Sequence, residues 1–253
     1  MEIRSLICGF ALAAAATVAA AAGDVVVTSS NTCGLMNVPS TDKYTMIAVP
    51  WLQVGGGAVK VCDLVKTDTL TAGDKLYYYN GSAFEVWELG SGKTWTALTT
   101  VGEANGITTA EAAADKTIAR GQALWLERPT NQATEIWLYG QYAAEAASVT
   151  VAQGSAEVVA YTMVANPTAA DFDLNVKGVA GAAGDQVSVP ADTGIADLYT
   201  YDGAKWMRKT VTTMTVGGKE RQVKVDTDQG CVVPAGRGVW YVSKGGKPTI
   251  SWN

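Results

Sequence analysis

The residue types that most often carry enzyme chemistry are scarce in this sequence. None of the 253 residues is histidine, which removes His-based catalytic triads, histidine metal ligands and the most common general base. Paired carboxylates can hydrolyse glycosidic bonds without histidine, and the candidate pairs are Glu85 with Glu88 and Glu127 with Glu135. Nothing in the sequence favours one pair over the other. We therefore expect no enzymatic activity and no catalytic residue.

Two loops match ligand-binding motifs only in part. Gly90–Thr94 ends like a phosphate-binding P-loop, but Trp87 stands where that motif needs a glycine, and a strand-like run follows instead of a helix. Asp171–Asn175 opens like a calcium loop, but Val176 and Ala182 replace the required glycine and glutamate. We interpret both segments as surface turns and predict no cofactor and no metal. Weak calcium binding by Asp171–Asn175, or by the similar acidic turn Asp226–Gly230, is the alternative.

The first 22 residues have the composition of a secretory signal peptide. Arg4 precedes an apolar stretch that starts at Leu6 and ends in alanines before Gly23. A membrane-spanning helix is the alternative, but this mostly alanine stretch is at the lower limit of the length that spans a bilayer. We expect cleavage after about Ala22 and export to the cell surface or the medium, with the periplasm as a further option. No membrane span is expected in the mature chain.

Three cysteines remain after the leader, namely Cys33, Cys62 and Cys231. An odd number in an exported chain allows at most one internal disulfide. Cys33 and Cys62 are nearest in sequence and are the predicted pair. Unpaired cysteines inside a β core are the alternative, because the thiol is small and apolar.

Composition narrows the class of protein further. Hydrophobic residues make up 48% of the chain, which is too much for a disordered protein. Charged residues make up 17% and the net charge is −5, which leaves no basic face for a nucleic acid. We expect a folded globular chain that does not bind nucleic acid.

Short runs rich in Val, Thr, Tyr and Trp predict an all-β fold. Glycine- and asparagine-containing turns separate these runs, and one segment, Thr109–Lys116, suggests a helix of two turns at most. Many short strands with frequent turns are typical of sandwiches and barrels. The strand-like runs of the first part are Val25–Thr28, Thr45–Val49, Lys75–Tyr79, Phe84–Leu89, Thr94–Val101, Ala123–Glu127 and Glu135–Tyr139.

Three blocks of sequence recur in the same order, which predicts an internal duplication. We expect two tandem copies of a small β-sandwich or barrel-like unit, residues 23–141 and 147–253, joined by a linker at 142–146. The glycine turns Asn80-Gly81 and Asp202-Gly203 are expected at equivalent hairpin tips. The matching blocks are Tyr44–Pro50 with Tyr161–Pro167, Leu76–Gly81 with Leu198–Gly203, and Ala119–Trp125 with Pro234–Trp240; Ile136-Trp137 also matches Ser251-Trp252.

The order of these blocks resembles a repeat of uncharacterised secreted and surface proteins of bacteria. That repeat runs Leu/Met-Ile-x-x-Pro, then Tyr-x-Tyr-Asp/Asn-Gly, then Pro-x-Gly-x-Gly-x-Trp. The first copy departs from it, because Arg120-Gly121-Gln122-Ala123 replaces the Gly-x-Gly. The resemblance implies a compact exported β domain and no activity. The matching segments are Met46–Pro50, Tyr77–Phe84 and Arg120–Trp125, and then Met163–Pro167, Tyr199–Trp206 and Pro234–Trp240.

A two-residue turn at Asn80-Gly81 predicts a hairpin with Tyr79 opposite Ser82 and Tyr77 opposite Phe84. Side chains alternate between the two faces of such a hairpin. One face then carries Tyr77, Tyr79, Phe84 and Val86, and the other carries Leu76, Tyr78, Ala83 and Trp87.

The second face gives the candidate binding residues. In the second copy, Thr200 and Lys209 take the places of Tyr78 and Trp87, which indicates a face in contact with water. Tyr78 and Trp87 are therefore predicted to form an outward aromatic surface for a glycan or a partner subunit. Burial under a loop or under the other copy is the alternative.

Together, these features favour an exported structural or adhesive β-rich protein that acts through surface contacts. Its partners are expected to be like subunits or other surface components. The alternative is a carbohydrate-binding module, because eight Trp and ten Tyr offer many rings for stacking on sugars. Against that alternative, most Trp residues of small β domains fill the core.

Overall fold

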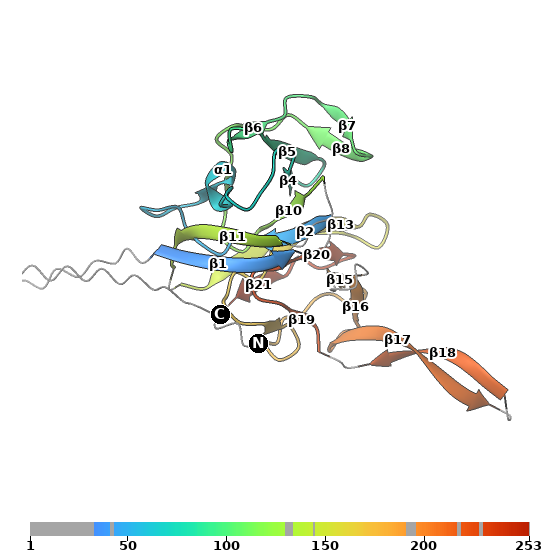
Figure 1. The fold of residues 1–253 in the computed structure, drawn as a ribbon. Coiled ribbons are helices and arrows are strands. Elements are labelled where there is room, and N and C mark those ends of the chain that lie inside the picture. The colour runs from blue at the N-terminus through green and yellow to red at the C-terminus, as the bar shows by residue number, and fades with distance from the viewer. Residues whose placement is uncertain are drawn as a thin grey trace, which may run out of the picture.

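The computed structural model describes residues 33–40, 43–129, 134–143, 145–190, 196–216, 219–227 and 230–252. The expected signal peptide and its cleavage site lie outside these residues. The described chain is almost entirely β, which confirms the expected fold class (Figure 1). Its one short helix, α1 (Val61–Leu64), is not where a helix was expected: Thr109 and Ala110 belong to a strand, and a turn follows. No described helix has the length and apolar character to cross a membrane.

Residues 33–143, the first half, form a main sheet with two small ladders beside it. The two-stranded ladders pair β1 (Cys33–Ser40) with β11 (Thr134–Gln141) and β3 (Val59–Lys60) with β9 (Thr117–Ile118). The seven-stranded main sheet runs in the order β2 (Tyr44–Ala48), β10 (Ala123–Glu127), β4 (Lys75–Tyr79), β5 (Phe84–Leu89), β8 (Ile107–Ala110) and β7 (Gly102–Ala104), with β6 (Trp95–Ala97) also paired to β5.

Residues 145–252, the second half, repeat much of this arrangement. The ladders pair β12 (Ala147–Thr150) with β21 (Thr249–Trp252) and β14 (Phe172–Asp173) with β19 (Val232–Val233). The six-stranded sheet runs in the order β13 (Ala160–Ala165), β20 (Gly238–Ser243), β15 (Gln186–Val189), β16 (Asp197–Tyr201), β17 (Trp206–Val216) and β18 (Lys219–Thr227).

The first four strands of the two sheets correspond, and a buried aspartate marks the match. Asp74 and Asp185 each precede the third strand, and the carboxylate of each accepts a backbone N–H three residues earlier, at 2.9 Å. Gly73 and Gly184, just before them, both adopt positive φ, at 91° and 92°. Because these two turns match, β4 corresponds to β15 and β5 corresponds to β16. That the halves are tandem copies of one unit stays a prediction, which this correspondence supports.

The expected equivalence of the two glycine turns is wrong. Asn80-Gly81 connects the third and fourth strands of its sheet, whereas Asp202-Gly203 connects the fourth and fifth. Both turns need a glycine with positive φ and are preceded by half-buried strands that favour tyrosine, so their local sequences look alike. Local hairpin chemistry does not specify where in a sheet a hairpin lies.

Each half has its own hydrophobic core, between the main sheet and the β1–β11 or β12–β21 ladder. In the first half, Trp87 on β5 lies among side chains from β2, β4, β10, the ladder and α1. In the second half, Trp206 and Tyr241 occupy the core with Phe172 and Trp252. Because the ladder and α1 cover one face of the first sheet, the opposite face is left to meet the second half.

The second half also carries a projecting two-stranded arm, β17–β18. Its register runs from Arg208 opposite Thr227 to Val216 opposite Lys219. Figure 1 shows this ribbon, in orange, extending away from the body of the molecule. Met214, near its far end, is 47% exposed. Isolated two-stranded ribbons are only marginally stable in water, so the arm depends on the body at its base or on a partner.

Candidate functional site

The two halves meet along a seam between β2 and β10 of the first half and β13 and β20 of the second. The backbone N–H of Ala48 donates to Gly236 O at 2.9 Å, and that of Ala165 donates to Gly121 O at 2.8 Å. Since Ala48 corresponds to Ala165 and Gly121 to Gly236, each contact is the counterpart of the other. The seam is therefore pseudo-two-fold symmetric.

Glycine is required at both of these positions. Gly121 and Gly236 have φ of 89° and 69°, a region that other residues rarely adopt. A Cβ at Gly121 would lie 3.0 Å from a methyl of Val149, and one at Gly236 would lie 3.0 Å from a methyl of Val38. Each glycine thus allows the ladder of the opposite half to approach its backbone.

Beneath the exposed side of the seam lies a small apolar cluster. Met46 and Met163 are both nearly fully buried and hold matching positions on β2 and β13. Ala48, Ala123 and Ala165 complete the cluster. These small side chains bring the two sheets close enough for large aromatic rings to meet above them.

Four aromatic rings form a continuous row over this cluster, which we call the aromatic row. Tyr44 lies 5.9 Å from Trp125, Trp125 lies 6.0 Å from Trp240, and Trp240 lies 6.2 Å from Tyr161, between ring centroids. The row follows the pseudo-symmetry, because Tyr44 matches Tyr161 and Trp125 matches Trp240. The two tyrosines are 38% and 47% exposed and the two tryptophans are half-buried. Rings at these distances are fixed by edge and face contacts while part of each remains open to solvent.

Two further rings come from the first half alone. Phe84 stacks on Trp125 with centroids 5.9 Å apart, and Tyr79 meets Trp240 edge-on at 5.4 Å. Both rings are half-buried. They widen the aromatic row on one side, so the aromatic surface is less symmetric than the backbone below it.

A buried carboxylate anchors the Tyr44 end of the row. Glu127 accepts hydrogen bonds from Tyr44 Oη at 3.0 Å, from Asn105 Nδ2 at 3.1 Å and from the Tyr77 hydroxyl, and it pairs with Lys43 Nζ at 3.1 Å. Burial alone would raise the pKa of Glu127, but the donors from Tyr77, Lys43 and Tyr44 outweigh it and lower that pKa. The carboxylate is thus held ionised and positions Tyr44.

Of the other three carboxylates considered for acid–base chemistry, two form ion pairs. Glu85 pairs with Lys116 at 3.1 Å and Glu88 pairs with Lys75 at 3.7 Å. Glu135 lies exposed on β11, while Glu127 is buried on β10. The contacts of Glu85 and Glu88 fit structural ion pairs.

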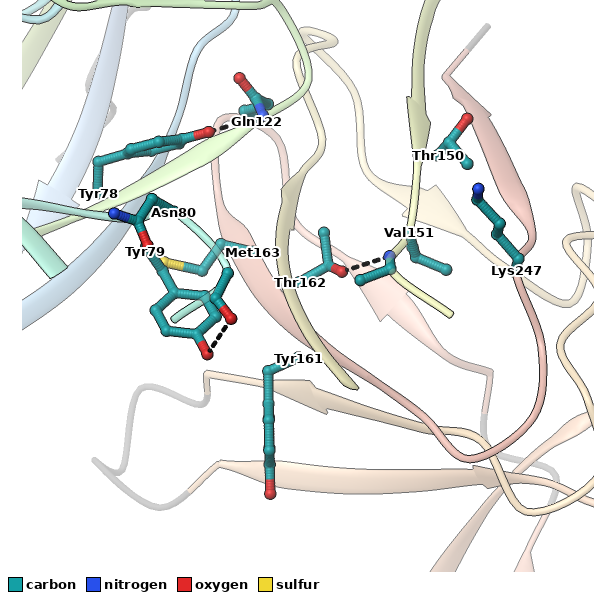
Figure 2. Close-up of a pocket in the computed structure, with 12 residues that line it drawn as sticks. Tyr78, Tyr79, Asn80, Gln122, Thr150, Val151, Tyr161, Thr162, Met163 and Lys247 are labelled. Carbon is teal, nitrogen blue, oxygen red and sulfur yellow. Dashed lines mark hydrogen bonds between the residues drawn. The ribbon is translucent and has the colours of Figure 1, made fainter. Parts of the chain in front are cut away.

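A pocket of about 400 Å³ opens beside the row, between the halves. Figure 2 shows Tyr79 on one side of it and Lys247 on the other. The first half contributes Tyr78, Tyr79, Asn80, Gly81 and Gln122 to the lining, and the second half contributes Thr150, Val151, Ala152, Tyr161, Thr162, Met163 and Lys247. Because Tyr79 and Tyr161 also contact Trp240, the pocket and the aromatic row form one surface.

The structure separates the two predicted binding residues. Tyr78 is half-buried and lines the pocket, and its hydroxyl accepts a hydrogen bond from Gln122 Nε2 at 3.1 Å. Trp87 is 0% exposed, inside the first core, and its Nε1 donates to Ala113 O at 3.1 Å. The predicted outward surface of Tyr78 with Trp87 is therefore wrong. The face of the β4–β5 hairpin that was expected to contact water packs against the hydrophobic core of the first half.

This error came from comparing the wrong strands. Leu89 N donates to Asp74 O and Tyr201 N donates to Asp185 O, so β5 matches β16. The counterpart of Trp87 is then Tyr199, which is buried, and not Lys209 on the arm.

The hairpin register also differs from the prediction. Tyr79 lies opposite Phe84, because Asn80 Oδ1 accepts the N–H groups of Ser82 and Ala83 and draws four residues into the loop. The register is shifted by two residues, an even number. The predicted membership of the two faces therefore holds for the residues within β4 and β5.

The predicted disulfide is absent, since Cys33, Cys62 and Cys231 are all free thiols. The sulfur of Cys62 faces Ala114 O, while that of Cys33 lies beside the hydroxyl of Tyr139 on β11. The third thiol, Cys231, is buried, which raises its pKa. The sequence-nearest cysteines thus lie against different parts of the fold.

The two motif-like loops serve as turns. In Gly90–Thr94, Gly90 N donates to Thr94 O and closes the turn between β5 and β6. Asp173 Oδ1 accepts the Asn175 N–H at 2.8 Å, and Asp171 Oδ1 accepts that of Ala235 at 3.0 Å. Within the described part of the chain, no cluster of three or more acidic or cysteine side chains could hold a metal ion.

Comparisons of the chain with protein-family models, with curated proteins and with solved structures each gave no match. The candidate site therefore depends on its geometry alone. Sequence reasoning missed Tyr44, Trp125, Tyr161 and Trp240 as a group. The signal was present, because these four residues occupy paired positions in the first and third repeated blocks.

Proposed function

We propose that this chain is an exported adhesive protein that binds other surface components through the aromatic row. The observation that carries the proposal is that Tyr44, Trp125, Trp240 and Tyr161 form a contiguous, partly exposed array drawn from both halves. Contiguous exposed apolar surface on a soluble domain marks an interaction site more often than scattered single residues do.

The row suits binding because its rings are held in place before a ligand arrives. Trp125 and Trp240 are fixed by contacts with neighbouring rings, and Tyr44 is fixed by its hydrogen bond to Glu127. Aromatic side chains with few free torsions lose little entropy when a partner covers them. Tyrosine and tryptophan are accordingly enriched among the residues that dominate binding energy.

A contact with like subunits has separate support from the arm. The β17–β18 ribbon projects from the body, with Lys209, Thr213 and Met214 exposed along it. By sequence, residues 206–227 contain five basic and two acidic residues, whereas the rest of the chain has 14 basic and 22 acidic residues. This charge difference favours docking of the arm on the acidic body of another copy.

The aromatic row can be tested on the chain that lacks residues 1–22. Binding of purified protein to washed envelope fractions of its native host is measured by co-sedimentation, and self-association by sedimentation velocity. The variant Tyr44→Ala with Tyr161→Ala is compared with Tyr139→Ala and Tyr142→Ala, a second pair of exposed tyrosines.

We expect the row variant to bind the envelope at least about tenfold more weakly, the loss typical of interface hot spots. The control pair should bind like the parent protein. Equal retention of both variants would contradict the proposal. Loss of self-association alone would assign the row to contacts between copies.

A further inference from the structure

We propose that the pocket beside the row binds a carboxylate-bearing sugar unit of a glycan chain. This inference rests on the proposed function, because it names the ligand class of the same surface. It follows from three properties of the lining: two hydroxyl protons without an acceptor and a cation without an acidic partner, both among the described residues, and two tyrosine rings.

The first property is an excess of hydrogen-bond donors. Tyr78 Oη and Thr162 Oγ1 each accept a hydrogen bond, from Gln122 Nε2 at 3.1 Å and from Ala152 N at 2.8 Å. Among the described residues, neither hydroxyl has an acceptor for its own proton. Since a hydroxyl can donate and accept at once, both can donate to a ligand in the pocket. A ligand rich in acceptor oxygens fits this lining.

Two contacts fix the side chain of Tyr78. Lys116 Nζ lies 4.8 Å from the centroid of its ring, and Gln122 fixes its hydroxyl. The amide of Gln122 is fixed in turn, because its Oε1 accepts the Ala119 N–H at 3.0 Å. The donor is thus preorganised before a ligand binds, which reduces the entropy lost on binding.

The second property is the charge of the lining. Among the described residues that line the pocket, Lys247 is the one that carries a charge, and it is exposed. No acidic group in the described part of the chain forms an ion pair with it. An ammonium at the mouth of a pocket favours an anionic ligand, and a carboxylate there gains a charge-assisted hydrogen bond.

The third property is the pair of ring faces. The Tyr79 hydroxyl donates to Gly81 O at 2.9 Å, which fixes that ring, while the ring of Tyr161 is 47% exposed. The C–H bonds on the face of a pyranose are weakly positive and suit the negative face of an aromatic ring. Sugars combine such faces with many hydroxyl oxygens, so they match both the rings and the donors of this pocket.

The size and surroundings of the pocket fit one part of a longer chain. Its volume of about 400 Å³ lies within the range of small-ligand sites. Trp240 touches both Tyr79 and Tyr161, so a glycan that leaves the pocket passes directly onto the aromatic row. The pocket would then supply selectivity for charge, and the row would supply additional contact area.

The test uses the chain without residues 1–22 and calorimetric titration with tetrasaccharides of pectin and of alginate, both of which carry uronate groups. The methyl-esterified pectin tetrasaccharide is the neutral reference, and a tetraglutamate peptide is the reference for charge alone. Variants are Lys247→Gln, Tyr161→Ala and Tyr78→Phe. Controls are Lys244→Gln and Tyr142→Ala, which replace a lysine and an exposed tyrosine outside the pocket.

We expect at least one uronate tetrasaccharide to bind, and its ester to bind about tenfold more weakly, as expected for loss of a charge-assisted hydrogen bond. Lys247→Gln should weaken binding of the acidic tetrasaccharide and leave binding of the ester unchanged. Tyr161→Ala should weaken binding of both, and Tyr78→Phe should weaken binding of the acid severalfold. Neither control should change binding.

Several results would overturn the inference: no binding of either acid, equal binding of acid and ester, tetraglutamate binding as tightly as the sugars, or insensitivity to Lys247→Gln. The proposed function is judged separately, by envelope binding of the Tyr44 and Tyr161 double variant. If that variant loses envelope binding while the parent protein binds no uronate, the row is the contact surface and the pocket is not a site for acidic sugars.

Discussion

The two halves share the strands that build the seam and diverge after the fourth strand of each main sheet. After β5, the first half folds β6, β7 and β8 back onto its own sheet. After β16, the second half extends its chain into the β17–β18 arm. Of the two turns expected to be equivalent, Asp202-Gly203 lies where the second half diverges, whereas Asn80-Gly81 lies within the shared strands. The shared part positions the row and pocket, and the divergent parts give each half its own outer surface.

The halves also stabilise their matching aspartates in different ways. Asp74 is fully buried with Arg128, whose Nε lies 3.4 Å from its carboxylate. Asp185 is fully buried too, but accepts a hydrogen bond from the neutral Tyr241 hydroxyl at 2.7 Å and from the Lys244 N–H at 2.7 Å. One turn geometry therefore tolerates both a buried ion pair and a network of hydrogen bonds.

This difference leads to the largest expected effect. Arg128→Met leaves the buried Asp74 charge without its cation and should cost about 3–5 kcal/mol in free energy of unfolding. Tyr241→Phe removes one hydrogen bond to Asp185 and should cost about 1.5–3 kcal/mol. Urea denaturation of the two variants measures both values. A larger loss of unfolding free energy for Tyr241→Phe than for Arg128→Met would contradict the expectation that breaking the buried ion pair is the more destabilising change.

The pseudo-symmetry of the seam predicts matched effects at its two glycines. Gly121→Ala and Gly236→Ala each combine positive φ with a crowded Cβ, and each should destabilise the protein by about 2–3 kcal/mol. Gly81→Ala is the control for backbone strain, because its φ is 102° with no atom within 4 Å of a Cβ. It should cost about 1 kcal/mol. Thermal unfolding checks the series, and a neutral result at either seam glycine would count against the symmetry.

Glu127 lies in the first half only, since Val242 holds the corresponding place on β20. Because hydrogen bonds lower the pKa of Glu127 below 4.5, its ionised form stabilises the folded chain above about pH 4.5. This contribution is lost as the pH falls through the lowered pKa. Glu127→Gln should cost about 1–3 kcal/mol at pH 7.

The parent protein should also lose more stability than Glu127→Gln between pH 6 and about pH 3, with the sign set by this linkage. Urea denaturation across that range measures the difference. Parallel pH profiles for the two proteins would mean that the carboxylate network contributes nothing specific to the folded state.

The arm should give the smallest change in stability. Replacing residues 210–225 by Asn-Gly shortens the β17–β18 ribbon to its base, and the unfolding free energy of the body should change by less than about 1 kcal/mol. Met214→Ser tests the exposed apolar side chain without shortening the ribbon. Both variants should reduce self-association in sedimentation velocity. A body that unfolds with the shortened arm would show that the ribbon belongs to the core.

The sequence predicts the fold class well and the arrangement of the halves in part. The blocks at Tyr44–Pro50 and Ala119–Trp125 and their counterparts hold matching places in the two sheets. The first block forms β2 and β13, and the second joins β10 and β20 to the glycines that the seam requires, Gly121 and Gly236. The block that contains the hairpin turn, Leu76–Gly81 with Leu198–Gly203, does not hold matching places in the two sheets. A tyrosine-rich strand before Asn-Gly or Asp-Gly encodes a local turn that any pair of neighbouring strands can use.

The candidate site was predictable only through Tyr78. Alternation separates the two faces of β4 and β5 but does not say which face is covered, and that depends on the distant β1–β11 ladder and on the second half. The row needs Trp125 and Trp240 to meet across the seam, a contact between residues 115 positions apart. The local sequence pattern carries no information about contacts between residues so far apart in the sequence. The repetition of Tyr44 and Trp125 as Tyr161 and Trp240 was the available hint.

Hydroxyl-radical footprinting of the chain bound to its host envelope is the sharpest test of binding through the aromatic row, because it reads each aromatic side chain without any substitution. We expect Tyr44, Trp125, Tyr161 and Trp240 to become protected together, while Tyr142, which is 54% exposed away from the row, reacts as in the free protein. Protection of Tyr142 with continued reaction of the four row residues would contradict it.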